Sequence, residues 1–409
     1  MADESQPSAL SFRDFRFFLA MRLPAALAVQ MQSVAVGWQV YDISHSPLSL
    51  GLVGLAQFLP IFGLALIAGH VADRFDRRRI LTACIGVQLL CSALLLAIML
   101  SGTRDVRPIY AVLFLFGIAR SFSAPATQSI LPNLVPRNLL SSAFAWNSSS
   151  FQTMTIAGPA IGGLVYAIGA GAVYVFSAAL FAVAVLATLA IRTPVVQADG
   201  RGMDWSSLLA GIRFIRARPA ISGAISLDLF AVLFGGATAL LPVYARDILV
   251  IGPLGLGFLR SAPAVGAVVV GLILAHRSLG RHTGRTMFIA VAIFGIATIV
   301  FGLSRNFIVS LLALAVLGAA DMISVFVRQN LVQRSTPDSM RGRVNAVNFL
   351  FIGASNELGE MESGATAAWF GSIEAVVAGG VGTLIVMGLW AWLFPQLRRV
   401  DRLEDVESA

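Results

Sequence analysis

The chain has 409 residues, of which 57% are hydrophobic and only 12% are charged, and its mean hydropathy is +0.82. A soluble domain carries roughly 25% charged residues, so this composition excludes a soluble protein and indicates a membrane protein. The formal net charge is +8, and every residue in the Lys+Arg total is an arginine. The absence of lysine excludes a P-loop lysine, a Schiff-base lysine and a pyridoxal anchor.

Apolar stretches long enough to cross a membrane recur along the whole chain. A transmembrane helix needs about 20 apolar residues, and the N-terminal segment has no cleavage site of a signal peptide, so the first helix is expected to insert the chain. The sequence predicts an all-α membrane protein with 12 transmembrane helices. The predicted windows are residues 15–41, 49–72, 80–101, 108–131, 140–168, 171–191, 220–245, 254–276, 286–304, 307–332, 344–370 and 374–395.

The arginines are distributed unequally between the two sides of the predicted membrane. With an even number of spans both termini lie on one side, and the opposite loops contain only Arg104, Arg107, Arg246 and Arg305. By the positive-inside rule both termini are cytoplasmic. We expect a multi-pass protein of a bacterial-type inner membrane, with the lipid bilayer as partner and without a nucleic-acid partner.

The longest polar interval, residues 192–219, divides the spans into two sets of six. It predicts an N-terminal six-helix bundle at 1–191, a cytoplasmic linker at 192–219 and a C-terminal six-helix bundle at 220–409. Within the linker, Trp205 to Ile215 could form an amphipathic helix along the membrane surface. The bundles are expected to be pseudo-symmetric, because residues recur at a nearly constant offset: Gln128 and Gln329, Pro136 and Pro337, Asn147 and Asn348, Gly158 and Gly359, Gly163 and Gly364, and PLSLG at Pro47 and PLGLG at Pro253. Internal repeats of this kind are typical of transporters.

The stretch GHVADRFDRRR, between the second and third spans, resembles the signature loop of the major facilitator superfamily. Gly69, Asp73, Arg74, Arg77 and Arg78 match the pattern, whereas Asp76 replaces its glycine. The resemblance implies the major facilitator fold and a conformational latch that stabilises the outward-open state. On physical grounds, a glycine permits close helix approach, and arginines can pair with an aspartate or with anionic lipid. A simple positive-inside stop signal would explain the arginines but not the spaced glycine and aspartate.

The stretch AGPAIGG in the fifth span resembles the end of the glycine and proline motif of antiporters in the superfamily. Gly158, Pro159, Gly162 and Gly163 match it, while the upstream glycines of the full motif are missing. The resemblance implies export. Small residues also pack membrane helices without any transport role, and this alternative stays open.

Several further stretches resemble the enterobactin exporter and macrolide efflux group of the superfamily. They are ADRFDRRRIL, GAVYVFSAAL, LLAGIRFIRARPAISGAISL and TPDSMRGRVNAVN. The resemblance implies a secondary active exporter that works by alternating access and is coupled to protons. Its expected cargo is a neutral to anionic small organic molecule, such as a siderophore or a drug.

Ionisable residues inside the spans are costly and face a cavity or a partner by default. Asp321, with Glu357 and Glu360, is expected to carry the proton, because a carboxyl group whose surroundings change also changes its proton affinity. Arg120 is expected to tune Asp321 or meet an anionic substrate in the cavity. Arg22, Asp228 and Arg260 are assigned to gating or structure. Fixed ion pairs that hold helices together are the alternative for all of them.

Uncharged polar residues complete the predicted substrate cavity, namely Gln57, Gln152, Asn348 and Asn356. No cofactor and no metal site is expected: Glu357 and Glu360 could bind a divalent cation, but the four histidines lie in or near loops. One chain contains both halves, so a monomer is expected. A proton-coupled importer and a transport-inactive sensor remain alternatives, and an enzyme is not expected, since the sequence contains no HExxH or GxSxG motif.

Overall fold

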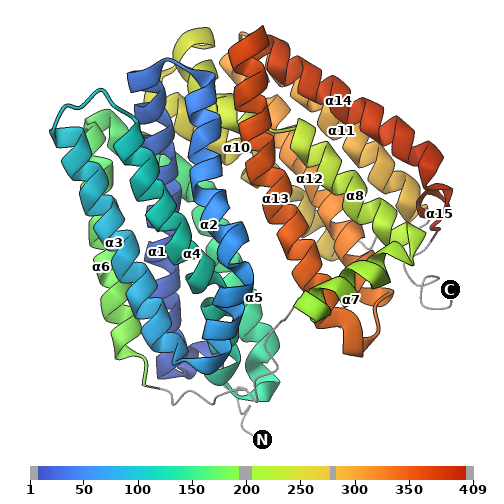
Figure 1. The fold of residues 1–409 in the computed structure, drawn as a ribbon, viewed down its shortest axis with the longest axis horizontal. Helices are drawn as coiled ribbons and strands as arrows, with labels where there is room; N and C mark the ends of the chain where they lie inside the picture. Colours follow the sequence, from blue (N-terminus) through green and yellow to red (C-terminus); the bar gives the residue numbers. More distant parts are fainter. Residues whose placement is uncertain (1–7, 193–204, 277–281, 402–409) are drawn as a thin grey trace, which may run out of the picture. The chain divides into compact units, whose positions relative to one another are not determined.

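The computed structural model describes residues 8–192, 205–276 and 282–401, and within these ranges the chain is helical and contains no strand (Figure 1). The helices are α1 (Arg13–Ser44), α2 (Pro47–Arg74), α3 (Arg77–Leu100), α4 (Arg107–Ile130), α5 (Leu140–Ile168), α6 (Ala170–Ala190), α7 (Trp205–Arg216), α8 (Pro219–Phe234), α9 (Leu241–Val243), α10 (Gly252–His276), α11 (Thr283–Leu303), α12 (Phe307–Arg334), α13 (Asp338–Phe370), α14 (Ser372–Leu393) and α15 (Pro395–Arg398). Each of the twelve predicted spans coincides with helical structure.

Eleven helical segments of the described chain are long and apolar enough to cross a membrane. The remaining predicted span is α13, which has 33 residues but contains Glu357, Glu360 and Glu362. Large apolar side chains are exposed on the spanning helices, including Ile168 and Trp369 at 79% and 81% exposure. In a membrane such side chains face lipid rather than water.

The chain forms two compact units. The first contains residues 1–39 and 59–202, and the second contains residues 40–58 and 203–409. The division therefore cuts the continuous helices α1 and α2 as well as the polar interval after α6. The predicted bundles at 1–191 and 220–409 stay a prediction, and residues 193–204 of the predicted linker lie outside the described residues.

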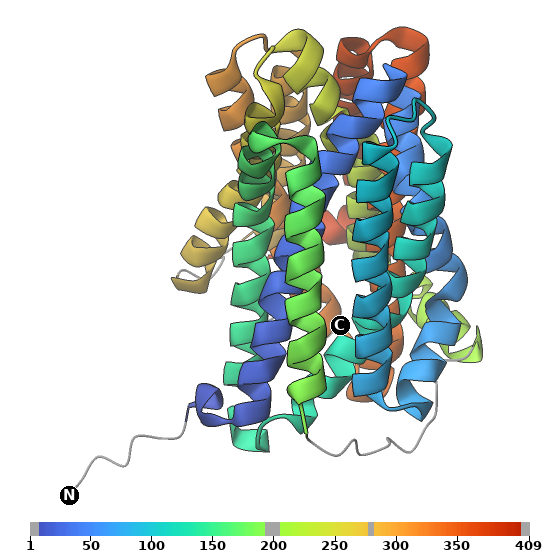
Figure 2. The same ribbon diagram turned by 90° about the vertical axis from the view of Figure 1, so that its left-hand side faces the viewer.

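In the first unit, α3 packs against both α4 and α6 (Figure 2). The buried face of α3 contains polar as well as apolar side chains, and Ser92 on it donates a hydrogen bond of 3.0 Å to Gln32 of α1. Phe116 of α4 and Phe181 of α6 meet edge to face with their ring centroids 6.3 Å apart. The unit is thus joined by polar bonds and aromatic packing, both of which suit helices surrounded by lipid.

In the second unit, α12 packs against α10 and α11, and α11 packs against α14. An apolar core lies between α8, α11, α12 and α14. The α10–α12 contact depends on glycine: a Cβ at Gly266 would overlap the carbonyl oxygen of Ala315, and a Cβ at Gly318 would overlap that of Pro263. The two backbones approach closely because both positions lack a side chain.

The seventh span is interrupted. Helix α8 ends at Phe234, Gly235 and Gly236 follow, and the chain continues through the 3₁₀ turn η4 (Ala237–Leu240), α9 and the π-helical turn η5 (Tyr244–Ile248). A Cβ at Gly236 would overlap the carbonyl oxygen of Gly359 in α13. Irregular backbone at membrane depth is tolerated where protein covers it, and here α13 covers the break.

Helix α7 lies in the polar interval and packs against α13 in the second unit (Figure 1). A Cβ at Gly211 would come within 2.9 Å of the carbonyl oxygen of Arg343. This face of α7 is therefore occupied by protein.

We predict that Gly266→Ala destabilises the second unit, by about 1–3 kcal/mol, because the new methyl group forces α10 and α12 apart. Gly271→Ala on the same helix is the matched control. A Cβ there would meet only the terminal methyl of Met322, at 3.4 Å, so the helix propensity of alanine should leave stability unchanged or slightly higher. Thermal unfolding of both variants in detergent measures the difference, and equal midpoints would contradict the close contact.

Candidate functional site

A buried ion pair lies between α8 and α12 in the second unit. The guanidinium of Arg328 (Nη2) is 3.2 Å from the carboxylate of Asp228 (Oδ2), and the two side chains are only 2% and 6% exposed. Nη1 of Arg328 donates a hydrogen bond of 3.0 Å to the amide oxygen of Asn348 in α13. The hydroxyl of Ser324 donates to Asp228 at 3.5 Å. One arginine therefore connects three helices.

Asp321 belongs to the same group of side chains. It lies one turn before Ser324 on α12, and it interacts electrostatically with both Asp228 and Arg328. Asp228, Asp321 and Ser324 line a small cavity of about 10 Å³, together with apolar residues of α8, α11 and α12. We call Asp228, Asp321, Ser324, Arg328 and Asn348 the Arg328 cluster. With both carboxylates ionised, these five residues carry one excess negative charge.

A second charged group lies where α2, α10 and α13 meet, still within the second unit. Glu357 and Glu360 of α13 interact electrostatically with Arg260 of α10. A Cβ at Gly54 of α2 would lie 2.7 Å from the carboxylate of Glu360 and 3.3 Å from that of Glu357. Both carboxylates therefore approach the same point on α2. Glu362 instead accepts a hydrogen bond of 2.9 Å from Thr366 on its own helix.

The loop that resembles the superfamily signature binds backbone carbonyl groups of the first unit. Buried Arg77 donates to Ala72 at 3.3 Å and to Ser129 at 2.8 Å, and Arg78 donates to Leu189. Asp76 caps the N-terminus of α3 by accepting from the amide of Arg78 at 2.9 Å. The departure from the family pattern thus has a local structural role.

The other predicted latch residues differ in what the structure shows. Arg74 is exposed, and a Cβ at Gly69 would meet nothing within 4 Å. The close helix approach expected at Gly69 is therefore not present among the described residues, because the last turn of α2 is open there. The side chain of Asp73 lies outside the described residues. The latch role stays a prediction.

The glycines of the antiporter-type motif form the contact between α5 and α1. Gly158, Pro159, Gly162 and Gly163 are all buried. A Cβ at Gly158 would overlap the side chain of Gln30, and one at Gly162 would lie 2.8 Å from the Cα of Met31. On the same two helices, Arg22 of α1 stacks on Phe151 of α5, which lies two turns before Gly158. The guanidinium is 4.8 Å from the ring centroid. The motif lies at a tight helix crossing of the first unit.

The predicted cavity residues have different surroundings. Asn348 is buried and holds Arg328, whereas Asn356 is exposed and donates to the carbonyl of Ile352 on its own helix at 2.9 Å. Arg120, Gln57 and Gln152 are half-buried. The structure thus brings Asp321 together with Asp228 and Asn348, and Glu357 and Glu360 together with Arg260.

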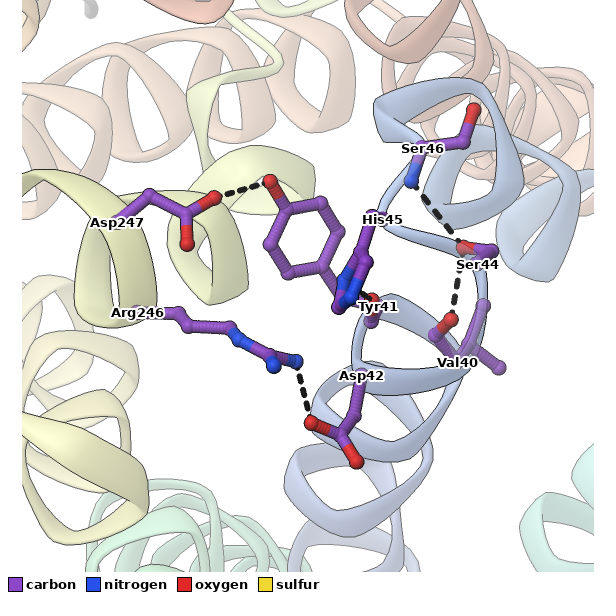
Figure 3. A network of polar contacts seen from close by, with 8 residues as sticks. All are labelled: Val40, Tyr41, Asp42, Ser44, His45, Ser46, Arg246 and Asp247. Carbon is purple, nitrogen blue, oxygen red and sulfur yellow. Dashed lines mark hydrogen bonds and ion pairs between the residues drawn. The ribbon is translucent and has the colours of Figure 1, made fainter. Parts of the chain in front are cut away.

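Sequence reasoning missed a further polar network in the second unit (Figure 3). The hydroxyl of Tyr41, in the last turn of α1, donates to Asp247 of η5, and Arg246 of η5 pairs with Asp42. We call these four residues the α1–η5 network. The Asp42 and Arg246 side chains are 54% and 29% exposed, so their ion pair is worth at most about 1 kcal/mol.

One protein-family model matches residues 5–409, and its family is described as "Transmembrane secretion effector". The enterobactin exporter EntS of Shigella boydii serotype 18 is 27% identical over 401 residues, which cover 94% of this chain and 92% of that protein. EntS of Escherichia coli O81 gives the same values.

Solved structures of transporters have the same fold. A bacterial homologue of the human lysosomal transporter Spinster matches with a TM-score of 0.72 and 15% identity, covering 96% of this chain and 97% of that one. A D-xylose–proton symporter matches with a TM-score of 0.71 and 13% identity, covering 93% and 97%. The chain is therefore a transporter rather than an enzyme, and it belongs to the transmembrane secretion effector family of the major facilitator superfamily.

Proposed function

We propose that the protein is a proton-coupled exporter of a small organic molecule and that the Arg328 cluster binds the coupling proton. The exporter name of the relatives supports the direction of transport. The observation that carries the coupling is the buried ion pair of Asp228 and Arg328, with Asp321 at the same cavity.

The charge balance of the cluster supports proton binding. Asp228 and Asp321 share one guanidinium, so the cluster holds one uncompensated negative charge when both carboxylates are ionised. Coulomb energies are large in a medium of low dielectric constant, and binding of one proton removes the excess charge. A rearrangement of α8 against α12 changes the distances within the cluster. The affinity for the proton then differs between the two states of an alternating-access cycle.

The chemical class of the cargo is proposed from the exporter relatives and from the charged residues inside the spans. We propose a siderophore of the enterobactin type or a drug of similar size, neutral to anionic, with Arg120 as the cation that it meets. Glu357 and Glu360 are proposed as a second proton-responsive pair, with Arg260 as their counter-charge. We propose a bacterial inner-membrane location with both termini in the cytoplasm, and the arginine distribution of the loops supports this orientation.

The first test is transport of enterobactin by inside-out vesicles that hold a respiration-driven pH gradient. Addition of enterobactin should dissipate the gradient with the wild-type protein, because protons leave through the transporter in exchange for cargo. Asp321→Asn should reduce this response to that of vesicles without the protein, since the amide cannot release a proton. A dye whose fluorescence reports the gradient gives the measurement.

Asp105→Asn, a change in the exposed loop before α4, is the control for Asp321→Asn and should transport normally. Size-exclusion profiles of both variants establish that they are folded. Coupled transport at the wild-type rate by Asp321→Asn would remove Asp321 from the mechanism. A labelled compound that binds without any flux would argue against an exporter.

The contributions of Asp228 and Arg328 to the free energy of unfolding should depend on one another. Asp228→Asn removes the carboxylate that contacts the guanidinium of Arg328 directly, which leaves only Asp321 as its counter-charge, and it should lower the free energy of unfolding by at most about 3–5 kcal/mol. Asp228→Asn combined with Arg328→Gln should be clearly more stable than the sum of the two single effects predicts, because each single variant already loses the contact between the two side chains. Thermal unfolding in detergent measures the cycle, and additive losses would show that the pair is not energetically coupled.

A further inference from the structure

Two buried polar atoms of the first unit lie close to an aromatic ring and have no hydrogen-bond partner. The guanidinium of Arg22 in α1 is 4.8 Å from the ring centroid of Phe151 in α5, and its Nε is unpaired among the described residues. Asn147 precedes Phe151 by one turn of α5, and its Oδ1 is also unpaired within the described part of the chain. Phe151 itself is 42% exposed. We call Arg22, Asn147 and Phe151 the Arg22 site.

The internal repeat relates the Arg22 site to the Arg328 cluster. The PLSLG and PLGLG stretches are 206 residues apart, and this offset relates Arg22 of the first span to Asp228 of the seventh. In the fifth and eleventh spans, an offset of 201 residues relates Asn147 to Asn348. Arg22 and Asn147 therefore stand where the Arg328 cluster has Asp228 and Asn348.

The helix contacts agree with these two offsets. In the first unit, a Cβ at Gly158 of α5 would overlap the side chain of Gln30 in α1. The equivalent positions in the second unit are Gly359 and Gly236, and a Cβ at Gly236 would overlap the carbonyl oxygen of Gly359. Helices α1 and α5 thus meet at the same positions as the seventh and eleventh spans.

The equivalent positions carry opposite charges. The first-unit equivalents of Asp228, Asp321, Ser324, Arg328 and Asn348 are, in that order, Arg22, Arg120, Ser123, Thr127 and Asn147. The Arg328 cluster has one excess negative charge, whereas its equivalent has two positive charges and no carboxylate. Asn348 accepts a hydrogen bond from Arg328, but Thr127 donates to the carbonyl of Ser123 at 2.7 Å. Asn147 therefore lacks the donor that its equivalent has.

The first half of the chain supplies no counter-charge at this depth. Its six apolar windows, at residues 15–41, 49–72, 80–101, 108–131, 140–168 and 171–191, contain no aspartate and no glutamate. Within the residues that the structure describes, Arg22 forms no ion pair. A charge inside a span faces a partner or a cavity by default, and buried polar atoms are nearly always hydrogen-bonded. A ligand that carries an anion and a donor would satisfy both atoms.

The contact with Phe151 prepares Arg22 for such a ligand. A guanidinium is planar and has five N–H donors, which point outward along its plane. Stacking on the ring of Phe151 orients this plane and uses none of the donors. A carboxylate or an acidic hydroxyl can therefore bind at the edge of the guanidinium, while the exposed part of Phe151 offers an aromatic surface beside it.

We propose that the Arg22 site binds an acidic aromatic group of the cargo. The guanidinium of Arg22 pairs with the anion, the ring of Phe151 packs against the aromatic ring, and Asn147 accepts a hydrogen bond from a hydroxyl on it. The proposal rests on the proposed transport function and names the chemistry of its cargo. It gives Arg22 a binding role in place of the expected gating or structural one.

Binding of small probes to the purified protein in detergent tests the site without any transport. Labelled 3-hydroxybenzoate has the anion, the aromatic ring and the hydroxyl. Benzoate lacks the hydroxyl, 3-hydroxybenzamide lacks the charge, and 3-hydroxycyclohexanecarboxylate lacks the aromatic ring. Equilibrium dialysis, corrected for protein-free micelles, gives a Kd for each probe. 3-Hydroxybenzoate should bind most tightly to the wild-type protein.

Each variant should remove one preference. Arg22→Gln should weaken binding of 3-hydroxybenzoate at least about tenfold and bring it level with the amide, because the charged hydrogen bond is lost. Phe151→Leu should weaken it about threefold or more and abolish the preference for an aromatic ring. Asn147→Ala should bring 3-hydroxybenzoate level with benzoate, a loss of about threefold.

Further variants separate binding from folding. Arg22→Lys keeps a cation in the span and should retain the preference for the carboxylate over the amide. Phe176→Leu, an exposed ring on α6, and Arg107→Gln, an exposed arginine at the start of α4, are the matched controls. Both should leave all four Kd values unchanged.

The outcomes distinguish this site from the proposed function. Wild-type preferences that survive in Arg22→Gln, Phe151→Leu and Asn147→Ala would overturn the site, as would absence of 3-hydroxybenzoate binding to the wild-type protein. The predicted loss of preferences in a protein through which enterobactin drives no proton flux would refute only the proposed function. Enterobactin-driven flux together with unaltered preferences in the three variants would refute only the Arg22 site.

Discussion

The guanidinium of Arg328 carries its charge in the interior of a helical unit, where only 2% of the side chain is exposed. A buried charge without a partner would be strongly destabilising. Its neighbours must therefore supply a carboxylate, from Asp228 on α8, and a hydrogen-bond acceptor, from Asn348 on α13. These requirements fix the positions of three helices relative to one another. They also set the environment of Asp321. This carboxylate lines the same cavity, but the one guanidinium of the cluster contacts Asp228 directly.

Helix α13 connects this cluster to the other polar features of the second unit. It contributes Asn348 to the Arg328 cluster, Glu357 and Glu360 to the group around Arg260, and Gly359 to the contact with the interrupted seventh span. Its contact with Gly51 and Gly54 brings the first half of α2 against the carboxylates. A shift of α13 would therefore alter both charged groups and the attached segment 40–58 together. This connection gives a physical route by which the two charged groups depend on each other.

The spans could be predicted from the sequence because a membrane helix satisfies its own backbone hydrogen bonds and needs only a sufficient apolar length. Asp228, Asp321, Glu357 and Glu360 were recognisable because charges are costly at that depth. Their partners were not recognisable, since a sequence does not show which faces of distant helices meet. Asn348 was assigned to the cavity but holds Arg328, and Tyr41 gave no signal because a tyrosine near a span end is ordinary. The exposed position of Asn356 could not be predicted for the same reason.

The proposed function assigns the coupling proton to the Arg328 cluster, and in an exporter that exchanges protons for cargo the binding of cargo should favour release of this proton. Proton release on binding of enterobactin to the purified protein, in weakly buffered detergent solution with a pH indicator, tests it most directly. The wild-type protein should release protons as cargo binds, and Asp321→Asn should bind cargo with markedly less release. Equal proton release by both proteins would contradict the assignment of the coupling proton to this cluster.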